Sequence, residues 1–212
     1  MTTIYMIRHG QSMGNLERRL LGHTDLPLTE LGHRQAERAA EYLLQFGITR
    51  VYSSDLLRAR QTVEPLARRL SLEVIPERGL REIDAGEWEG LPFTLIKEKW
   101  AEEYRIFRVD LGRSTPPGGE STQHAADRLF ETVLRIADEN PDRRVLVASH
   151  AAVSCMFTAR VLGLAPEKVQ RLRLASNASF SVFESDGERV HLAESGNDGS
   201  LGDLRIVPPP RA

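Results

Sequence analysis

Ile4-Tyr5-Met6-Ile7-Arg8-His9-Gly10-Gln11-Ser12, near the start of the chain, is an apolar run that stops abruptly at a cation, an imidazole and a glycine. β-Branched and aromatic residues in so short a run predict a buried strand, and Gly10 lets the backbone turn without a Cβ in the way. Arg8 and His9 are therefore expected where this strand passes into a loop. In α/β sheets, ligands usually bind at that place, outside the carboxyl ends of the strands.

Two further strands, residues 50–54 and 144–149, are predicted to end at the same edge of the sheet. His150 follows the second of them directly, and Arg58 lies in the first turn of the helix that follows the first. Four basic side chains can therefore converge on one point: Arg8, His9, Arg58 and His150. Helix N-termini add unpaired N–H groups and a positive dipole end, so the combined site would favour a compact polyanion such as phosphate.

Strand and helix patterns alternate through most of the chain. Caps and apolar periodicity predict helices over about residues 13–21, 30–46, 92–107 and 122–139. Two strands near the end, residues 178–184 and 190–194, are joined by a hairpin. These patterns predict an α/β fold, a three-layer sandwich whose sheet is mainly parallel with an antiparallel part and has helices on both faces. We expect a single domain over residues 1–212, in which the tail 202–212 carries little pattern.

Composition narrows the class of protein. The 212 residues include 28 Lys and Arg against 30 Asp and Glu, so no global basic field indicates nucleic acid as a partner. Cys155 is the only cysteine, which excludes an intrachain disulfide, and no apolar stretch has the length of a membrane span or a signal peptide. We therefore expect a cytoplasmic protein that binds neither membrane nor nucleic acid. The sequence leaves open whether the protein forms a homodimer.

Three patterns point to other chemistry and are rejected. Residues 10–14 spell the G-x-S-x-G of serine hydrolases, but those enzymes draw part of their oxyanion hole from an earlier strand's loop, and only one strand fits before Ser12. Cys155 to Arg160 resembles the loop of cysteine phosphatases but is one residue too short and lies in a predicted helix. The six histidines form no close H-x-H or H-E-x-x-H pair, so we expect no metal site.

Four motifs in order resemble the histidine phosphatase superfamily, in its phosphoglycerate-mutase-like branch of broad-specificity and α-ribazole-type phosphatases. They are Arg8-His9-Gly10, Ser54 with Leu57-Arg58-Ala59-Arg60-Gln61-Thr62, Leu80-Arg81-Glu82, and Ser149-His150. One Arg-His-Gly is a weak signal, whereas four motifs in the family's order are a strong one. The resemblance covers roughly residues 2 to 200 and implies the phosphoglycerate-mutase-like fold.

The resemblance also implies a mechanism. His9 would be the nucleophile that attacks a phosphomonoester through Nε2, and its Nδ1 would keep a proton by donating to a backbone carbonyl. Glu82 would protonate the departing alcohol and then activate water. The remaining expected ligands of the phosphate oxygens are Arg8, Asn15, Thr24, Arg58 and His150. The expected partner is a small phosphorylated substrate, and neither a cofactor nor a metal is expected.

The loop after Glu82 favours a phosphatase over the alternatives. It is acidic, with Asp84, Glu87 and Glu89, whereas the mutases of this family place basic residues there. A cofactor-dependent phosphoglycerate mutase remains the alternative, because a carboxylate site could still come from Lys97, Lys99, Arg105 and Arg108. A non-catalytic phosphate-binding regulatory module is a further alternative. The chain departs from the family's pattern at Gln11, Ala151 and Ala152, where Glu and two glycines are usual.

Overall fold

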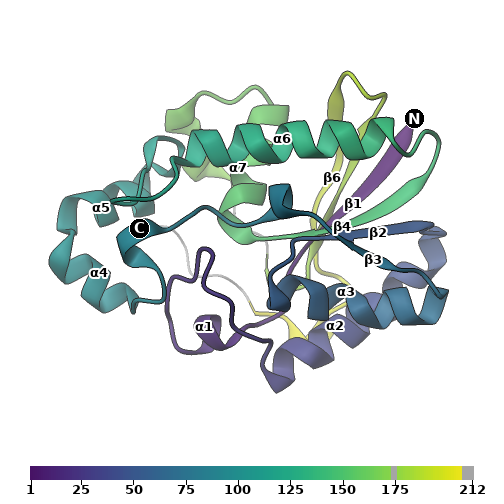
Figure 1. The fold of residues 1–212 in the computed structure, drawn as a ribbon, viewed down its shortest axis with the longest axis horizontal. Coiled ribbons are helices and arrows are strands. Elements are labelled where there is room, and N and C mark those ends of the chain that lie inside the picture. The colour runs from purple at the N-terminus through teal and green to yellow at the C-terminus, as the bar shows by residue number, and fades with distance from the viewer. Residues whose placement is uncertain (173–175, 207–212) are drawn as a thin grey trace.

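The computed structural model describes residues 1–172 and 176–206. It contains a six-stranded sheet in the order β3-β2-β4-β1-β5-β6 (Figure 1). The strands are β1 (Thr2–Arg8), β2 (Arg50–Ser53), β3 (Val74–Pro76), β4 (Arg144–Ser149), β5 (Phe180–Ser185) and β6 (Val190–Asn197). The first four pair in parallel, and β5 runs antiparallel to β1 and to β6. The prediction of a mainly parallel sheet with an antiparallel part is confirmed.

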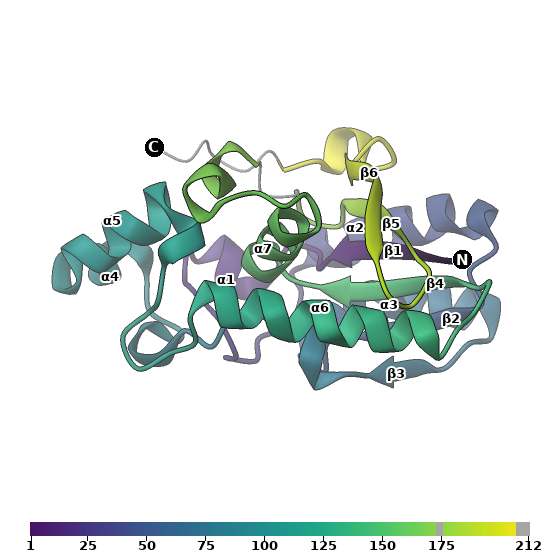
Figure 2. The same cartoon turned by 90° about the horizontal axis from the view of Figure 1, so that it is seen from above.

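Helices cover both faces of this sheet. The α-helices are α1 (Met13–Leu16), α2 (Glu30–Leu43), α3 (Leu57–Leu70), α4 (Phe93–Lys99), α5 (Ala101–Val109), α6 (Thr122–Asp138) and α7 (Ala151–Val161). Short 3₁₀ turns are η1 (Leu44–Phe46), η2 (Arg78–Leu80), η3 (Gly86–Trp88), η4 (Leu111–Arg113), η5 (Pro166–Arg171) and η6 (Gly202–Leu204). α6 and α7 lie on one face, and α2 and α3 lie on the other (Figures 1 and 2). This is the predicted three-layer sandwich.

The alternation of side chains along the central strands explains why their sequences are continuously apolar. In β1, Ile4 and Met6 belong to the core under α6 and α7, while Tyr5 and Ile7 belong to the core under α2 and α3. β4 divides in the same way, with Val145 and Val147 on the first side. Because both faces of these strands are buried, successive residues are all apolar until the strand ends. The polar residues that follow mark the edge where the site forms.

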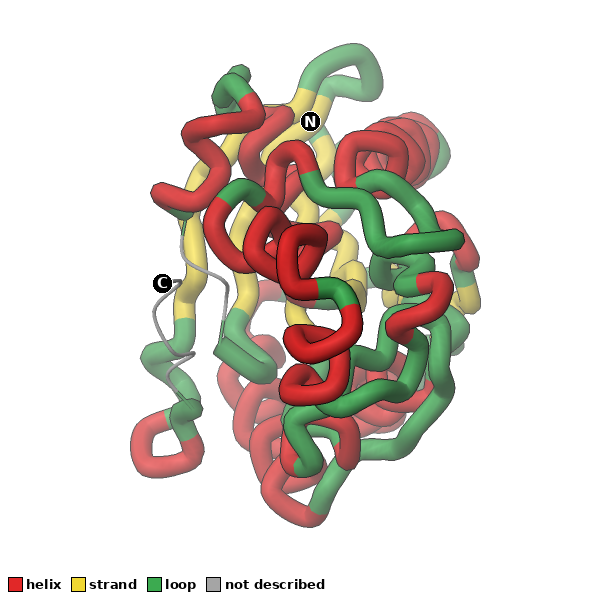
Figure 3. The backbone as a smooth tube through the Cα atoms, turned by 90° about the vertical axis from the view of Figure 1, so that its left-hand side faces the viewer, coloured by secondary structure: helices red, strands yellow, loops and turns green. Residues whose placement is uncertain are grey.

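A third apolar cluster lies beyond that edge of the sheet. Its buried members are Ala85, Trp88 and Ile96, and α4 and α5 contribute further side chains, among them Trp100 and Phe107. Figure 3 looks onto this end of the molecule and shows helices and loops standing in front of the strands. The region after the loop of Glu82 therefore forms a covering layer over the strand ends.

Two predicted helices differ from the expected length. The helix predicted over residues 13–21 ends at Leu16, because Arg18 has a φ of 56°, a left-handed conformation that does not continue a helix. The helix predicted over residues 92–107 is divided at Trp100, whose φ of −132° and ψ of 59° separate α4 from α5. In the tail, Leu204 of η6 is buried, and residues 207–212 lie outside the described residues. Within residues 1–172 and 176–206, no helix is both long and apolar enough to cross a membrane.

Candidate active site

His9 stands at the end of β1, with 5% of its surface exposed. Its backbone N–H donates to the Ser149 carbonyl across the parallel pair with β4, at 3.1 Å. Its Nδ1 lies 2.7 Å from the Gly10 carbonyl oxygen, which can only accept, so Nδ1 carries the proton. In the neutral ring, Nε2 then holds an unshared electron pair. The expectation that a backbone carbonyl fixes the tautomer of this histidine is confirmed.

The electrostatic surroundings keep His9 neutral. Burial lowers its pKa well below the usual 6.5, and the nearby charges of Arg58 and Arg8 lower it further. A protonated imidazole would have no electron pair on Nε2, so a low pKa keeps the side chain nucleophilic at neutral pH. The same two cations are placed to attract an anionic ligand.

Arg58 is almost completely buried, at 1% exposure, in the first turn of α3. Its guanidinium donates to the carbonyls of Gly22 at 2.7 Å and Thr24 at 2.9 Å. Burial lowers its pKa to about 10, although the carboxylates of Glu82, Asp25 and Glu89 oppose the shift. Arg58 therefore remains a cation at neutral pH, and two backbone carbonyls fix its orientation.

Arg8 carries the second fixed charge of the site. Desolvation lowers its pKa to about 10, with Glu82 raising it and Arg58 lowering it. The guanidinium stays protonated at neutral pH. Since the charge of Glu82 acts on both arginines, the carboxylate and the two cations belong to one electrostatic cluster.

His150 completes the group from β4. It is fully buried at the N-cap of α7, and its ring centroid lies 5.2 Å from that of His9. Its Nε2 is 2.8 Å from the hydroxyl of Ser54. Burial lowers its pKa well below 6.5, and the charge of Arg58 lowers it further. The two strand-end histidines and the helix arginine therefore meet as the sequence predicts.

Glu82 reaches the site from a loop, and the first turn of α7 holds its carboxylate. Oε1 accepts from the N–H groups of Val153 at 2.9 Å and Ile83 at 3.1 Å, and Oε2 accepts from Ala152 at 3.0 Å. The unpaired N–H groups at a helix start are natural partners for an anion. Thus the helix that presents His150 at its N-cap also orients the carboxylate of Glu82.

Asn15 and Thr24 are close to these residues but are engaged with the protein. Asn15 Oδ1 accepts from the Ser12 N–H and from Asn177 Nδ2, and Asn177 Nδ2 also donates to the His9 carbonyl. The Thr24 hydroxyl donates to Glu89, while its carbonyl accepts from Arg58. Thr24 thus contributes a main-chain oxygen that orients Arg58.

Three residues outside the expected catalytic and phosphate-binding set also shape the site. Ser54 contacts His150, and Asn177 links the His9 carbonyl to Asn15. The Glu89 carboxylate accepts hydrogen bonds from the loop that holds Arg58, at His23 and Thr24, and from the loop after Glu82, at Ala85. Ser54 belongs to one of the four motifs that resemble the family, and it follows a strand end as the histidines do. No local pattern marks the other two. In the described part of the chain, no group of three or more His, Cys, Asp or Glu side chains is placed to hold a metal ion.

Comparison with known proteins places this arrangement in context. The sequence profile of the Histidine phosphatase superfamily (branch 1) matches residues 4–198. "Phosphoglycerate mutase-like protein 4" of Arabidopsis thaliana is 35% identical over 205 residues, which cover 91% of this chain and 88% of that protein.

Two solved structures share the fold over nearly the whole chain. Bacillus stearothermophilus YhfR superposes with a TM-score of 0.90 at 28% identity and covers 95% of this chain and 100% of its own. Mycobacterial glucosyl-3-phosphoglycerate phosphatase with VO3 superposes with a TM-score of 0.85 at 31% identity and covers 92% and 99%. The chain therefore shares its fold with these two solved structures, and its sequence matches the histidine phosphatase family profile.

Proposed function

The chain belongs to the histidine phosphatase superfamily, branch 1, and from this premise we propose that it hydrolyses a small phosphorylated metabolite through a phosphohistidine on His9. One observation carries the proposal. His9 is buried and neutral, has its Nδ1 proton held by the Gly10 carbonyl, and lies beside two permanent cations. This combination suits attack on a dianionic phosphoryl group.

In the first step, the Nε2 electron pair of His9 attacks phosphorus, the N–P bond forms and the bond to the departing alkoxide oxygen breaks. Arg8, Arg58 and His150 are assigned to the non-bridging oxygens. Fixed donors and charges aimed at the transition state are typically worth ~2.7 to 4 kcal/mol each. In the second step, water gives up a proton and attacks phosphorus, the new O–P bond forms as the N–P bond breaks, and inorganic phosphate leaves His9 in its neutral form.

Glu82 is assigned as the acid of the first step and the base of the second. A carboxylate has about four lone-pair positions, and three backbone N–H groups donate to those of Glu82. These contacts fix the side chain while leaving capacity for one proton to pass to or from the substrate. Two permanent cations supply the charge that a divalent metal supplies in other phosphatases, so we propose metal-independent phosphomonoester hydrolysis.

The proposed partner is the small substrate alone, without nucleic acid or membrane, in the cytoplasm. The single, buried cysteine supports a reducing compartment, where disulfides are rare.

The proposal is tested by trapping the intermediate. The enzyme is mixed with a labelled phosphomonoester and quenched in alkali, which preserves a phosphohistidine, or in acid, which destroys it. Label on His9 after alkaline quenching, absent in His9→Asn, is the expected result. Activity that a chelator abolishes and Mg²⁺ or Zn²⁺ restores would overturn metal independence.

The role of Glu82 has its own test. Glu82→Gln is expected to slow the first phosphoryl transfer far more for an alkyl phosphate than for p-nitrophenyl phosphate, whose phenolate leaves with little protonation. Single-turnover kinetics is needed, because loss of the base slows the later hydrolysis equally for both substrates. Equal losses in the first step would exclude Glu82 as the acid.

A cofactor-dependent phosphoglycerate mutase is the second candidate, since a curated relative at 35% identity carries a mutase-like name. The acidic character of Asp84, Glu87 and Glu89 supports the phosphatase instead, because a phosphoglycerate carboxylate would meet like charge there. A panel of phosphorylated metabolites decides between them, with 3-phosphoglycerate assayed with and without bisphosphoglycerate and glucosyl-3-phosphoglycerate included. Phosphate release supports the phosphatase, and isomerisation without release supports the mutase. If no substrate of the panel is hydrolysed or isomerised, the non-catalytic phosphate-binding module is the alternative that remains.

A further inference from the structure

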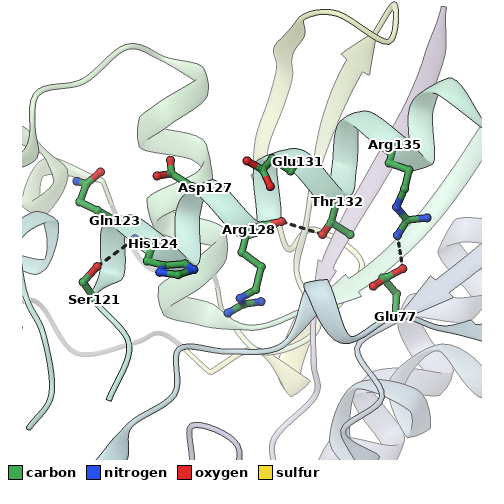
Figure 4. Close-up of a pocket in the computed structure, with 9 residues that line it drawn as sticks. All are labelled: Glu77, Ser121, Gln123, His124, Asp127, Arg128, Glu131, Thr132 and Arg135. Carbon is green, nitrogen blue, oxygen red and sulfur yellow. Dashed lines mark hydrogen bonds and ion pairs between the residues drawn. The ribbon is translucent and has the colours of Figure 1, made fainter. Parts of the chain in front are cut away.

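One face of helix α6 packs along the chain segment that immediately precedes Glu82. Arg128, Thr132 and Arg135 are spaced four and three residues apart, so they share one side of the helix. Figure 4 shows them along α6, with Arg135 joined to Glu77. Gly79 packs so tightly against Thr132 that a Cβ added to this glycine would lie 2.0 Å from the threonine hydroxyl.

Arg128 makes the contacts closest to Glu82. Its Nη1 donates to the carbonyls of Gly79 at 2.7 Å and Arg81 at 3.1 Å, and its Nη2 donates to the Glu82 carbonyl at 3.1 Å. Nε and Nη2 donate to the two oxygens of Glu120, at 3.1 and 2.9 Å. A guanidinium has five N–H donors, and these five hydrogen bonds account for all of them.

Glu120 extends this contact to the other side of Glu82. Its backbone N–H donates to the Asp84 carbonyl at 2.9 Å, and its Oε2 accepts from the Asp84 N–H at 3.4 Å. The Arg128–Glu120 pair therefore holds the main chain both before and after Glu82. Since α7 holds the carboxylate, the backbone and the side chain of Glu82 are fixed by two different helices.

We propose that Arg128 is a positioning residue for Glu82, an inference that rests on the acid and base roles assigned above. The described hydrogen bonds of Arg128 reach neither strand-end histidine, although its charge helps to lower the pKa of His150. Its direct contact with the proposed acid is through the carbonyl of Glu82. A shift of that backbone would move the carboxylate away from the departing oxygen. General acid–base catalysis is sensitive to such a displacement. The deficit should therefore depend on how much protonation the leaving group needs.

Arg135 provides the matched control. It lies on the same face of α6 and forms ion pairs with Glu77 and Glu139. None of its described polar contacts reaches residues 79–84. A general effect of losing an arginine from α6 should appear in both variants, whereas displacement of Glu82 should appear only when Arg128 is changed.

The experiment measures single-turnover phosphoryl transfer to His9 in wild type, Arg128→Ala and Arg135→Ala. For Arg128→Ala we expect a loss of about 10- to 100-fold with an alkyl phosphate and less than about threefold with p-nitrophenyl phosphate. Arg135→Ala should match the wild type with both substrates. Arg128→Lys, which keeps the charge but lacks the planar fork, should fall between them and serves if the alanine variant does not fold.

Chemical rescue adds a readout that a purely structural role would not move. A cavity of about 820 Å³ opens along α6, and Arg128 lines it together with Thr132 and Arg135. Millimolar guanidinium, far below denaturing concentrations, should enter the space left in Arg128→Ala and restore the alkyl phosphate rate. It should not accelerate the wild type or Arg135→Ala.

Two outcomes separate this inference from the proposed function. If the wild type forms no phosphohistidine, the proposed function fails. If the wild type forms it and Arg128→Ala, or Arg128→Lys in its place, slows both leaving groups equally, the positioning role is wrong. The same conclusion follows if guanidinium restores nothing in Arg128→Ala.

Discussion

The two neutral histidines of the site should make the stability of the protein fall steeply in mild acid. His9 and His150 are 5% and 0% exposed, and burial and neighbouring positive charge lower both pKa values well below 6.5. In the unfolded chain, each imidazole regains a pKa near 6.5. Above that pH neither state binds the proton, and below it the unfolded chain binds protons that the native protein does not.

The magnitude follows from proton linkage. A group with a lower pKa in the folded state contributes stability that is present above the unfolded pKa and is lost as pH falls. The slope approaches about 1.4 kcal/mol per pH unit for each histidine and about 2.7 kcal/mol for both. The loss begins near pH 6.5 and continues down to the folded pKa values.

The assay is urea unfolding at intervals between pH 7.5 and 5, reported as the free energy of unfolding. His150→Asn should reduce the slope below pH 6 by about 1.4 kcal/mol per unit relative to the wild type. His33→Asn, at an exposed position of α2, serves as the control. An unchanged slope in His150→Asn would mean that this imidazole titrates normally in the folded protein, and the argument for a neutral His9 would lose its basis.

Three further outcomes follow from the structure. Arg58→Ala should lower kcat at least ~100-fold in steady-state assays, whereas Arg60→Ala, on the exposed side of α3, should change it less than about twofold; equal effects would contradict the assignment. Glu89→Gln should weaken inorganic phosphate binding about tenfold by calorimetry, because loop 22–24 loses a charged acceptor; unchanged affinity would refute this. Gly32→Ala should lower the free energy of unfolding by about 1–3 kcal/mol, since its Cβ would come 2.1 Å from a carbonyl oxygen; an unchanged urea midpoint would oppose it.

Much of the site could be predicted because its residues stand where local patterns end. His9 and His150 each follow the last residue of an apolar strand, and Arg58 lies in the first turn of the helix after β2. Parallel strands bring their carboxyl ends to one edge, so topology converts three local signals into one cluster. The same reasoning gave the sheet and its two helical layers, since both depend on periodicity over ten or fewer residues.

The rest depends on contacts between distant segments. Arg128 and the carbonyl of Glu82 are 46 residues apart, and their contact exists because α6 packs along that loop. Trp100 divides the helix predicted over residues 92–107, and its side chain packs in the cluster over the strand ends. Neither the contact nor the break in the helix can be predicted from local helix propensity, which tertiary packing routinely overrides.

The charges of the site form one coupled set rather than a group of separate ligands. Arg58 lowers the pKa values of both His9 and His150, and two backbone carbonyls fix its guanidinium. In the proposed mechanism its charge therefore performs two tasks, attracting the phosphoryl oxygens and keeping His9 unprotonated. A mobile cation could also attract the anion, but it could move away from His9. The pKa of His9 would then rise, and the imidazole would gain a proton. The buried, clamped guanidinium avoids this, because its charge is present at His9 before and after the substrate binds.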